Sequence, residues 1–451
     1  MSSSKAAHVL EDRKFFLTQY IRTLPLNIMS VAVSVAAWGL WILLDNTPLL
    51  GFFSLSSITS SICQQSMLVG SIVQTILPNM ADRTRENAIL QISWRIDSAI
   101  LACMLLGTLT FFLVTHADIV HNLGLLAFLS TGILALVEPL PATAIPLCNA
   151  KRLYGWMFLI NNCRNLTVIL GLASLLVYHA TTPRLGIGVW GCSILSALTV
   201  SLFFFYRQGL NPFERPPKAL THHFVTNIRQ ALASLVFYRF GILLFASLPS
   251  FFIAFIHSPK EIGLVAFSLS LSGFLYSALA PINEQIYGPT FSKLVAASQA
   301  RLLLRRIFQM AFITVLIAVP AAGLLYVFGV PILQMLHKTS FIGSFSLLPA
   351  FLCYRILIMI NFGFTHSLFS MNRYKVLGSM YLVSVLAAGA WCFAFRESFT
   401  WAVWALPLSA GCVGIISALY VSWLTWKGRS LQSRTMYSMV PEDLDRVLEH
   451  R

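Results

Sequence analysis

The chain is 451 residues long, with 57% hydrophobic residues, only 10% charged residues and a mean hydropathy of +0.76. Soluble domains carry about 25% charged residues, so this composition excludes a soluble globular protein and indicates a membrane protein. The formal net charge of +15 would also suit a nucleic-acid-binding protein. The positions of the basic residues along the chain distinguish a membrane protein from a nucleic-acid-binding protein.

Apolar segments of membrane-spanning length follow one another along the whole chain. A bilayer core of ~30 Å needs about 20 residues of apolar helix. Twelve segments meet this condition, at 25–45, 49–77, 92–115, 122–148, 154–179, 186–206, 230–256, 262–288, 307–331, 343–370, 375–395 and 401–426. The sequence thus predicts an all-α polytopic membrane protein with about 12 transmembrane helices.

The basic residues are distributed unequally between the two sides of these spans. If the N-terminus lies inside, the inside segments hold 23 of the 31 Lys and Arg residues. The outside loops hold four, namely Arg184, Lys260, Lys338 and Arg396. This asymmetry follows the positive-inside rule and predicts that both termini are cytoplasmic. Because the charge reflects topology, we expect no nucleic-acid partner.

The spans divide into two halves of six. The connection 207–229 has three prolines and four basic residues, and it separates an N-terminal lobe at 1–206 from a C-terminal lobe at 230–426. The short polar tail 427–451 follows. The second span ends in "ILPNMADR" and the eighth in "YGPTFSKL", at an offset of 211 residues. Such a repeat predicts two lobes around a central cavity, which is a transporter plan.

No motif in the chain predicts an enzyme. There is no P-loop, no nucleophile elbow and no pair of carboxylates at catalytic spacing. The eight cysteines fall in or beside apolar segments and have no metal-ligand spacing, so they resemble small core hydrophobes. We expect no catalytic residues, no metal and no cofactor.

Four arginines lie within the predicted spans, at Arg95, Arg164, Arg239 and Arg355. A charge in mid-bilayer costs about 2.5–3.5 kcal/mol on insertion scales, so such residues face a wet cavity, form an ion pair or reach the interface. Arg355, in "FLCYRILIMI", lies too deep to reach the interface, and His366 shares its helical face. For Arg95 and Arg239 an interfacial position stays open.

Polar neighbours accompany Arg164 in the segment "INNCRNL". Asn161, Arg164 and Asn165 follow i, i+3, i+4 spacing and predict one polar stripe on a helix. A stripe of this kind inside a span is typical of a surface that faces water or a polar ligand. A structural ion pair remains the alternative for Arg164.

Three acids accompany the four arginines inside the spans, at Asp97, Glu138 and Glu284. Each either pairs with an arginine or takes part in ion binding. Since four cations face three anions, at least one arginine lacks an acidic partner, which favours an anionic substrate. Guanidinium groups bind phosphate in a bidentate manner and stay charged at any relevant pH.

The 6+6 plan and residues 287–378 resemble a known family. The region begins "YGPTFSKLVAASQARLLLRRIF" and ends in "LFSMNRYKVLGSM". It is similar to the multidrug/oligosaccharidyl-lipid/polysaccharide (MOP) exporter superfamily, in particular to the polysaccharide-export branch with its Wzx-type flippases. The resemblance implies a MATE/MOP-like fold in the plasma (inner) membrane and a role in O-antigen, capsule or exopolysaccharide synthesis.

The resemblance also implies a substrate and roles for the charged residues. The family moves a polyprenyl-diphosphate-linked oligosaccharide from the inner to the outer leaflet. Arg164 and Arg355, with Arg239 and Arg95, would contact the diphosphate. Asn161 and Asn165 would bind sugar hydroxyls, and Glu138, Asp97 or Glu284 would couple to H⁺ or Na⁺. Besides membrane lipids, a polysaccharide polymerase and chain-length proteins would be partners.

Other functions stay as alternatives. Lipid II flippases resemble the chain but have fourteen spans and arginines in their first helix, whereas 25–45 has none. A MATE-type drug antiporter would need an acidic pocket, which four buried arginines argue against. A membrane-embedded polymerase or glycosyltransferase would need long outer loops, and every predicted outer loop is about ten residues or fewer.

Overall fold

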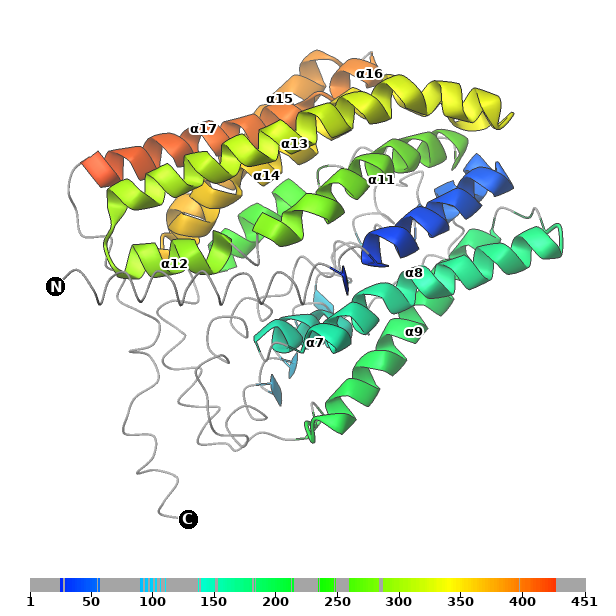
Figure 1. Cartoon of the computed structure of the whole chain (residues 1–451), viewed down its shortest axis with the longest axis horizontal. Helices are drawn as coiled ribbons and strands as arrows, with labels where there is room; N and C mark the ends of the chain where they lie inside the picture. The colour runs from blue at the N-terminus through cyan, green and yellow to red at the C-terminus, as the bar shows by residue number, and fades with distance from the viewer. Residues whose placement is uncertain are drawn as a thin grey trace.

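The structure is a computed structural model of the whole chain, and helices make up its framework (Figure 1). The described residues are 25–26, 29–54, 56, 90–91, 94–95, 98–99, 102–103, 106, 110, 137, 139–150, 153–180, 182, 184–211, 213–214, 234, 236–246, 248, 259–283, 287–396 and 398–426. Within them, six helices are long and apolar enough to cross a membrane. The predicted all-helical membrane class is therefore confirmed.

The described helices form two bundles. The N-terminal bundle contains the first helix Met29–Leu44, α7 (Pro139–Ala150), α8 (Tyr154–Val177) and α9 (Leu185–Arg207). The C-terminal bundle contains the helix Val236–Ala246, α11 (Pro259–Ile282), α12 (Gly288–Ala296), α13 (Ala300–Met335), the 3₁₀ helix η3 (Thr339–Ser346), α14 (Leu348–Ser370), α15 (Tyr374–Ala394), α16 (Phe399–Ala402) and α17 (Ala405–Trp426). Helices α7, α8 and α9 pack on one another, and α14 packs against α11, α13 and α17.

Several helices end in the same kind of turn. After α8, α9, α12, α13 and α14, one residue adopts a positive φ, respectively His179, Gly209, Ser298, His337 and Asn372. The next N–H then bonds back to a carbonyl inside the helix, as Lys338 does to Leu333 at 2.9 Å. This is the Schellman arrangement, which satisfies the last carbonyls of a helix. After α12, α13 and α14, the next helix begins within four residues of such a turn.

Two predicted spans differ in length from the structure. The span predicted at 262–288 contains the end of α11 at Ile282 and the start of α12 at Gly288; Asn283 and Tyr287 between them are π-helical, and 284–286 lie outside the described residues. Helix α13 has 36 residues, roughly 54 Å, against the predicted 307–331. Its first turns carry the charged residues 301, 305 and 306, so they extend the helix past the apolar core.

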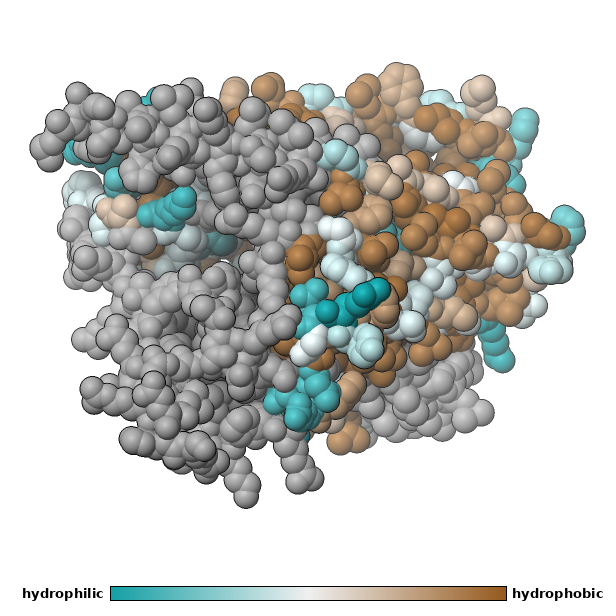
Figure 2. All heavy atoms as spheres, turned by 60° about the horizontal axis from the view of Figure 1, so that its bottom comes forward, coloured by the Kyte–Doolittle hydropathy of each residue, from teal (hydrophilic) through white to brown (hydrophobic). Residues whose placement is uncertain are grey.

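The surface of the described helices is apolar, as a lipid environment requires. Figure 2 shows hydrophobic side chains over most of the described surface on that face. Along α13, large apolar residues such as Phe312, Leu316 and Val327 are exposed, while few side chains are buried. Since water does not favour a contiguous apolar face of this size, we assign it to lipid contact.

The two ends of the molecule differ in how the bundles meet. We call the end with the turns at 45–46, 178–180 and 336–340 the hairpin end, and the end with the turns at 208–210, 297–299 and 371–373 the loop end. The helices of both bundles come together at the hairpin end, at the right of Figure 1. Toward the loop end, α9 runs away from α12.

Candidate functional site

Arg355 lies on α14 among aromatic rings. Its guanidinium carbon is 5.1 Å from the ring centre of Tyr276 on α11 and 5.9 Å from that of Tyr354. The side chain is half-buried, and its Nε atom is buried without a hydrogen-bond partner. Rings satisfy a cation through their π faces but accept no strong hydrogen bond. The Nε–H donor of Arg355 therefore has no acceptor among the protein atoms that the structure describes.

Arg239 repeats this arrangement one helix away. Its guanidinium carbon lies 5.9 Å from the ring centre of the preceding Tyr238. Both arginines thus stack on the tyrosine before them, in the dipeptides Tyr238-Arg239 and Tyr354-Arg355. The Tyr-Arg dipeptide is a sequence feature that both positions share, and it is overlooked when the arginines are considered alone.

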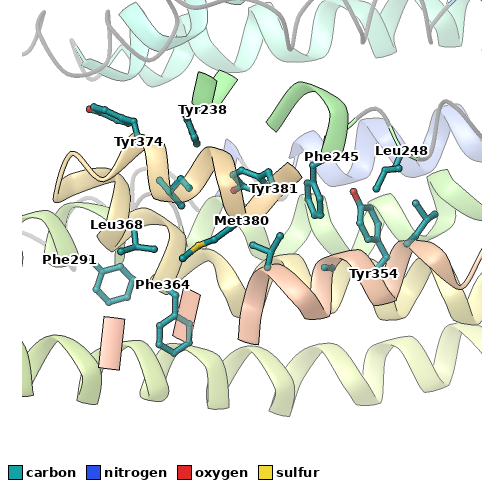
Figure 3. Close-up of a cluster of buried hydrophobic side chains, with 14 of the residues drawn as sticks. Tyr238, Phe245, Leu248, Phe291, Tyr354, Phe364, Leu368, Tyr374, Met380 and Tyr381 are labelled. Carbon is teal, nitrogen blue, oxygen red and sulfur yellow. The ribbon is translucent and has the colours of Figure 1, made fainter. Parts of the chain in front are cut away.

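One aromatic cluster contains both Tyr238 and Tyr354, the tyrosines that precede the two arginines (Figure 3). Phe245 lies 6.1 Å from Tyr354 and 5.1 Å from Tyr381, and Tyr238 lies 6.1 Å from Tyr381. These rings come from the helix Val236–Ala246, α14 and α15, and they are buried. Because they pack on one another, they form a rigid wall that fixes where each guanidinium sits.

The arginine site lies inside the C-terminal bundle. On α11, Phe267 and Phe274 both contact Trp38 of the first helix. Tyr276 follows Phe274 by two residues, which is about 200° around a helix, so it points to the opposite side. Arg355 therefore lies behind α11 as seen from the N-terminal bundle, and a ligand there would be held mainly by C-terminal helices.

No described carboxylate accompanies Arg355. Within the described residues the only carboxylates are Asp45, Glu214 and Glu261, and each lies in a turn or in the first turn of a helix. Arg355 is the eighth residue of α14, well away from such turns. The acids Asp97, Glu138 and Glu284, predicted for ion coupling or pairing, lie outside the described residues.

His366 shares a helical face with Arg355, as the spacing predicts. Its Nε2 atom lies 3.2 Å from the hydroxyl of Ser292 on α12, which in turn lies 3.0 Å from the hydroxyl of Ser370. The ring stacks on Phe362 at 5.1 Å. One face of α14 thus contacts both α11 and α12, Arg355 touching Tyr276 of α11 and His366 touching Ser292 of α12.

The predicted asparagine stripe on α8 faces in two directions. Asn165 donates to the Ser34 hydroxyl at 3.1 Å, and the neighbouring Asn162 accepts from the Ser30 hydroxyl at 2.9 Å. Asn162 is 1% exposed, whereas Asn161 is exposed. The pair Asn162 and Asn165 therefore ties the first helix to α8, and Asn162 is the member of this contact that the stripe missed.

The other predicted residues lie apart from Arg355. Arg164 is half-buried on α8, in the N-terminal bundle. Arg95 is exposed and donates to the backbone oxygen of Glu214 at 3.5 Å. The structure thus brings Arg239 and Arg355 to one aromatic cluster and leaves Arg164 and Arg95 elsewhere. Substrate contact stays a prediction for all four.

Among the described residues, no group of three His, Cys, Asp or Glu side chains is placed to hold a metal ion.

Comparison with known proteins identifies the fold. No family model and no curated protein matches the sequence. Solved structures do match over nearly the whole chain. An inward-facing multidrug resistance MATE family transporter of the MOP superfamily has a TM-score of 0.57 and 10% identity, covering 89% of this chain and 95% of that one.

Two further structures are similar to the same extent. The lipid II flippase MurJ in an inward closed conformation has a TM-score of 0.56 and 13% identity, with 90% of this chain and 87% of that chain covered. The eukaryotic MATE transporter AtDTX14 has a TM-score of 0.56 and 12% identity, with 93% and 100% covered. The chain has the fold of these transporters.

Proposed function

We propose that this protein is a membrane transporter that moves a polyprenyl-diphosphate-linked oligosaccharide between leaflets by alternating access. It would lie in the plasma membrane with both termini cytoplasmic, so that its loop end faces the cytoplasm. The fold supports transport, because it is shared with a lipid II flippase and with MATE transporters. In this orientation the hairpin end, where the described helices of both bundles come together, would lie on the outer side of the membrane.

The observation that carries the choice of substrate is the Arg355 guanidinium. It is held in mid-helix by Tyr276 and Tyr354, with a buried Nε atom that has no partner and no described carboxylate nearby. An anion with several oxygens supplies what this cation lacks, and a diphosphate does so in a bidentate manner. The lipid tail of such a substrate would stay in the bilayer while the protein carries its polar head.

A deletion strain tests the proposal. We expect lipid-linked saccharide to accumulate on the inner leaflet, measured by leaflet-resolved labelling of extracted lipid. Wild type should restore transfer, and Arg355→Ala should reduce it at least about tenfold, because charge-assisted hydrogen bonds contribute about 1.5–3 kcal/mol each. Arg355→Lys should restore part of the transfer, since lysine keeps the positive charge but cannot bind the diphosphate in a bidentate manner as a guanidinium does.

Arg207→Ala is the matched control. Arg207 also stacks on an aromatic ring, 5.4 Å from the centre of Phe203, but it lies at the end of α9. A strain that carries the Arg207→Ala variant should transfer the lipid-linked saccharide like wild type. If Arg355→Ala also does so, Arg355 is not the anion ligand. If the deletion strain accumulates no saccharide and instead becomes sensitive to cationic drugs, the alternative of a MATE-type antiporter replaces the flippase.

A further inference from the structure

Two hairpin tips, one from each bundle, bond to each other at the hairpin end. The Ser340 hydroxyl donates to the carboxylate of Asp45 and lies 3.4 Å from its backbone oxygen. The Lys338 ammonium donates to the backbone oxygen of Leu43 at 3.1 Å. Asp45 and Leu43 close the first helix, whereas Lys338 and Ser340 follow α13. These bonds therefore join the bundles across almost three hundred residues of sequence.

Local structure holds both tips in place before they meet. Asp45 has a φ of +50° and bonds through its N–H to the carbonyls of Trp41 and Ile42. The next residue, Asn46, accepts from the N–H of Leu49 at 3.0 Å and so caps the following helix. On the other side, the positive φ of His337 turns the chain out of α13. Since both turns are fixed by their own bonds, the contact between them is pre-organised.

Apolar contacts lie directly behind these bonds. Trp38 packs edge-on against Phe267 at 4.9 Å and against Phe274 at 5.8 Å. Gly263 of α11 approaches the backbone of Thr47 so closely that a Cβ atom on it would lie less than 3.0 Å from the Thr47 oxygen. The contact between the bundles at the hairpin end thus has polar bonds on its outer side and apolar packing on its inner side.

Among the described residues, the polar contacts at the loop end stay within one bundle. Gln91 donates to the Asn211 oxygen at 3.0 Å inside the N-terminal bundle, and His366 meets Ser292 inside the C-terminal bundle. Within the described residues, the hydrogen bonds between the bundles are therefore concentrated at the hairpin end. A contact of few bonds at one end can break without unfolding either bundle.

We propose that Asp45, Lys338 and Ser340 form a latch that holds the hairpin end closed, and that the end opens when this latch separates. The Asp45 carboxylate and the Lys338 ammonium are both at the rim, so water can replace each lost bond. The packing of Trp38 and the close approach of Gly263 to Thr47 are then the remaining contacts that oppose opening of the hairpin end. The role of the latch in transport rests on the proposed function, but its role in closing the hairpin end does not.

Distances between spin labels test the latch without any substrate. One pair reports the hairpin end, at Tyr178→Cys and Met335→Cys, whose side chains are 81% and 84% exposed. A second pair reports the loop end, at Tyr206→Cys and Trp426→Cys, with 79% and 85% exposed. The purified full chain in lipid nanodiscs, with Cys103 and Cys192 replaced by serine, should give one short distance population at the hairpin end.

Breaking the latch should add a longer population at that end. For Asp45→Asn, Ser340→Ala and Lys338→Met, we expect the ratio of open to closed molecules to rise, on the order of tenfold for the double variant Asp45→Asn/Ser340→Ala. Ser346→Ala is the matched control, because Ser346 bonds only to Gly343 within its own segment at 2.9 Å. It should leave the distances unchanged.

The outcomes separate the latch from the proposed function. If the double variant stays folded and keeps the wild-type hairpin distances, the latch is wrong whatever the protein transports. If the hairpin distances lengthen as expected but no lipid-linked saccharide is moved in the deletion-strain experiment, the latch stands and the proposed function fails. A variant that loses helical signal in circular dichroism is replaced by Lys338→Met, which removes only an exposed bond.

Discussion

The hairpin end and the loop end are built from the same helices but hold them in different ways. At the hairpin end, Trp38 and Asp45 of the N-terminal bundle contact Phe267 and Ser340 of the C-terminal bundle. At the loop end, the bonds of His366 stay within one bundle. Within the described residues, the hydrogen bonds between the two bundles therefore lie at the hairpin end, an arrangement that the proposed alternating access would use.

A covalent tie at the hairpin end should have the largest effect on this comparison. We expect that joining Asp45→Cys to Ser340→Cys with a short bifunctional thiol reagent abolishes transport, because the hairpin end can no longer open. Cleaving the link with reductant should restore it. Transfer of lipid-linked saccharide by the complemented deletion strain, before and after reductant, measures the effect. Transport that continues at the wild-type rate with the link in place would show that opening there is not needed.

A smaller effect is expected from adding a methyl group at the point where Gly263 of one bundle closely approaches Thr47 of the other. Gly263→Ala would place a methyl group against the Thr47 backbone, so the closed state should lose population several-fold in the hairpin label distances. Gly186→Ala is the paired test, because its Cβ atom would meet the Leu49 oxygen, which belongs to the same bundle. This variant should lower thermal stability. If both variants lower stability alike and neither moves the label distances, the hairpin contact is an ordinary core contact.

The smallest effect is expected at the loop end. Ser292→Ala removes the hydroxyl that lies between His366 and Ser370, so the C-terminal bundle should lose about 1 kcal/mol of stability. Neither label pair should change its distances, because this bond lies inside one bundle. Denaturant melts of the purified protein measure the first expectation and the spin labels the second. A change in the hairpin distances would mean that the two ends are coupled through α12 and α14.

Much of the fold follows from sequence because lipid imposes simple rules. Long apolar segments predict membrane helices, and helices α8, α9, α14 and α15 lie within a few residues of the predicted spans. Two cases depart from hydropathy. The charged first turns of α13 continue the helix beyond its apolar part, and α11 changes to π-helical geometry at Asn283, inside an apolar segment. Hydropathy indicates which residues face lipid, whereas backbone hydrogen bonding determines where a helix begins and ends.

The site was less predictable, because it depends on contacts between distant helices. The sequence singled out Arg355 as a costly charge, and Tyr354 was visible beside it. That Tyr276 of α11 covers the same guanidinium is a result of packing. On α8, spacing alone placed Asn161 with Asn165, but the position of the first helix selects Asn162 as the partner of Ser30. Helical spacing defines a face to within one residue, and only the neighbouring helix shows which residue it contacts.

By itself, the sequence determined that this is a helical membrane protein, and it predicted an orientation from its charges and a set of arginines within the spans that cost free energy to insert. It could do so because burial in lipid penalises charge wherever the helices lie relative to one another. Tertiary structure alone decided that Arg239 and Arg355 share one aromatic cluster, and that Asp45 meets Ser340 across the bundles. Those contacts join residues far apart in the chain, so no local pattern encodes them.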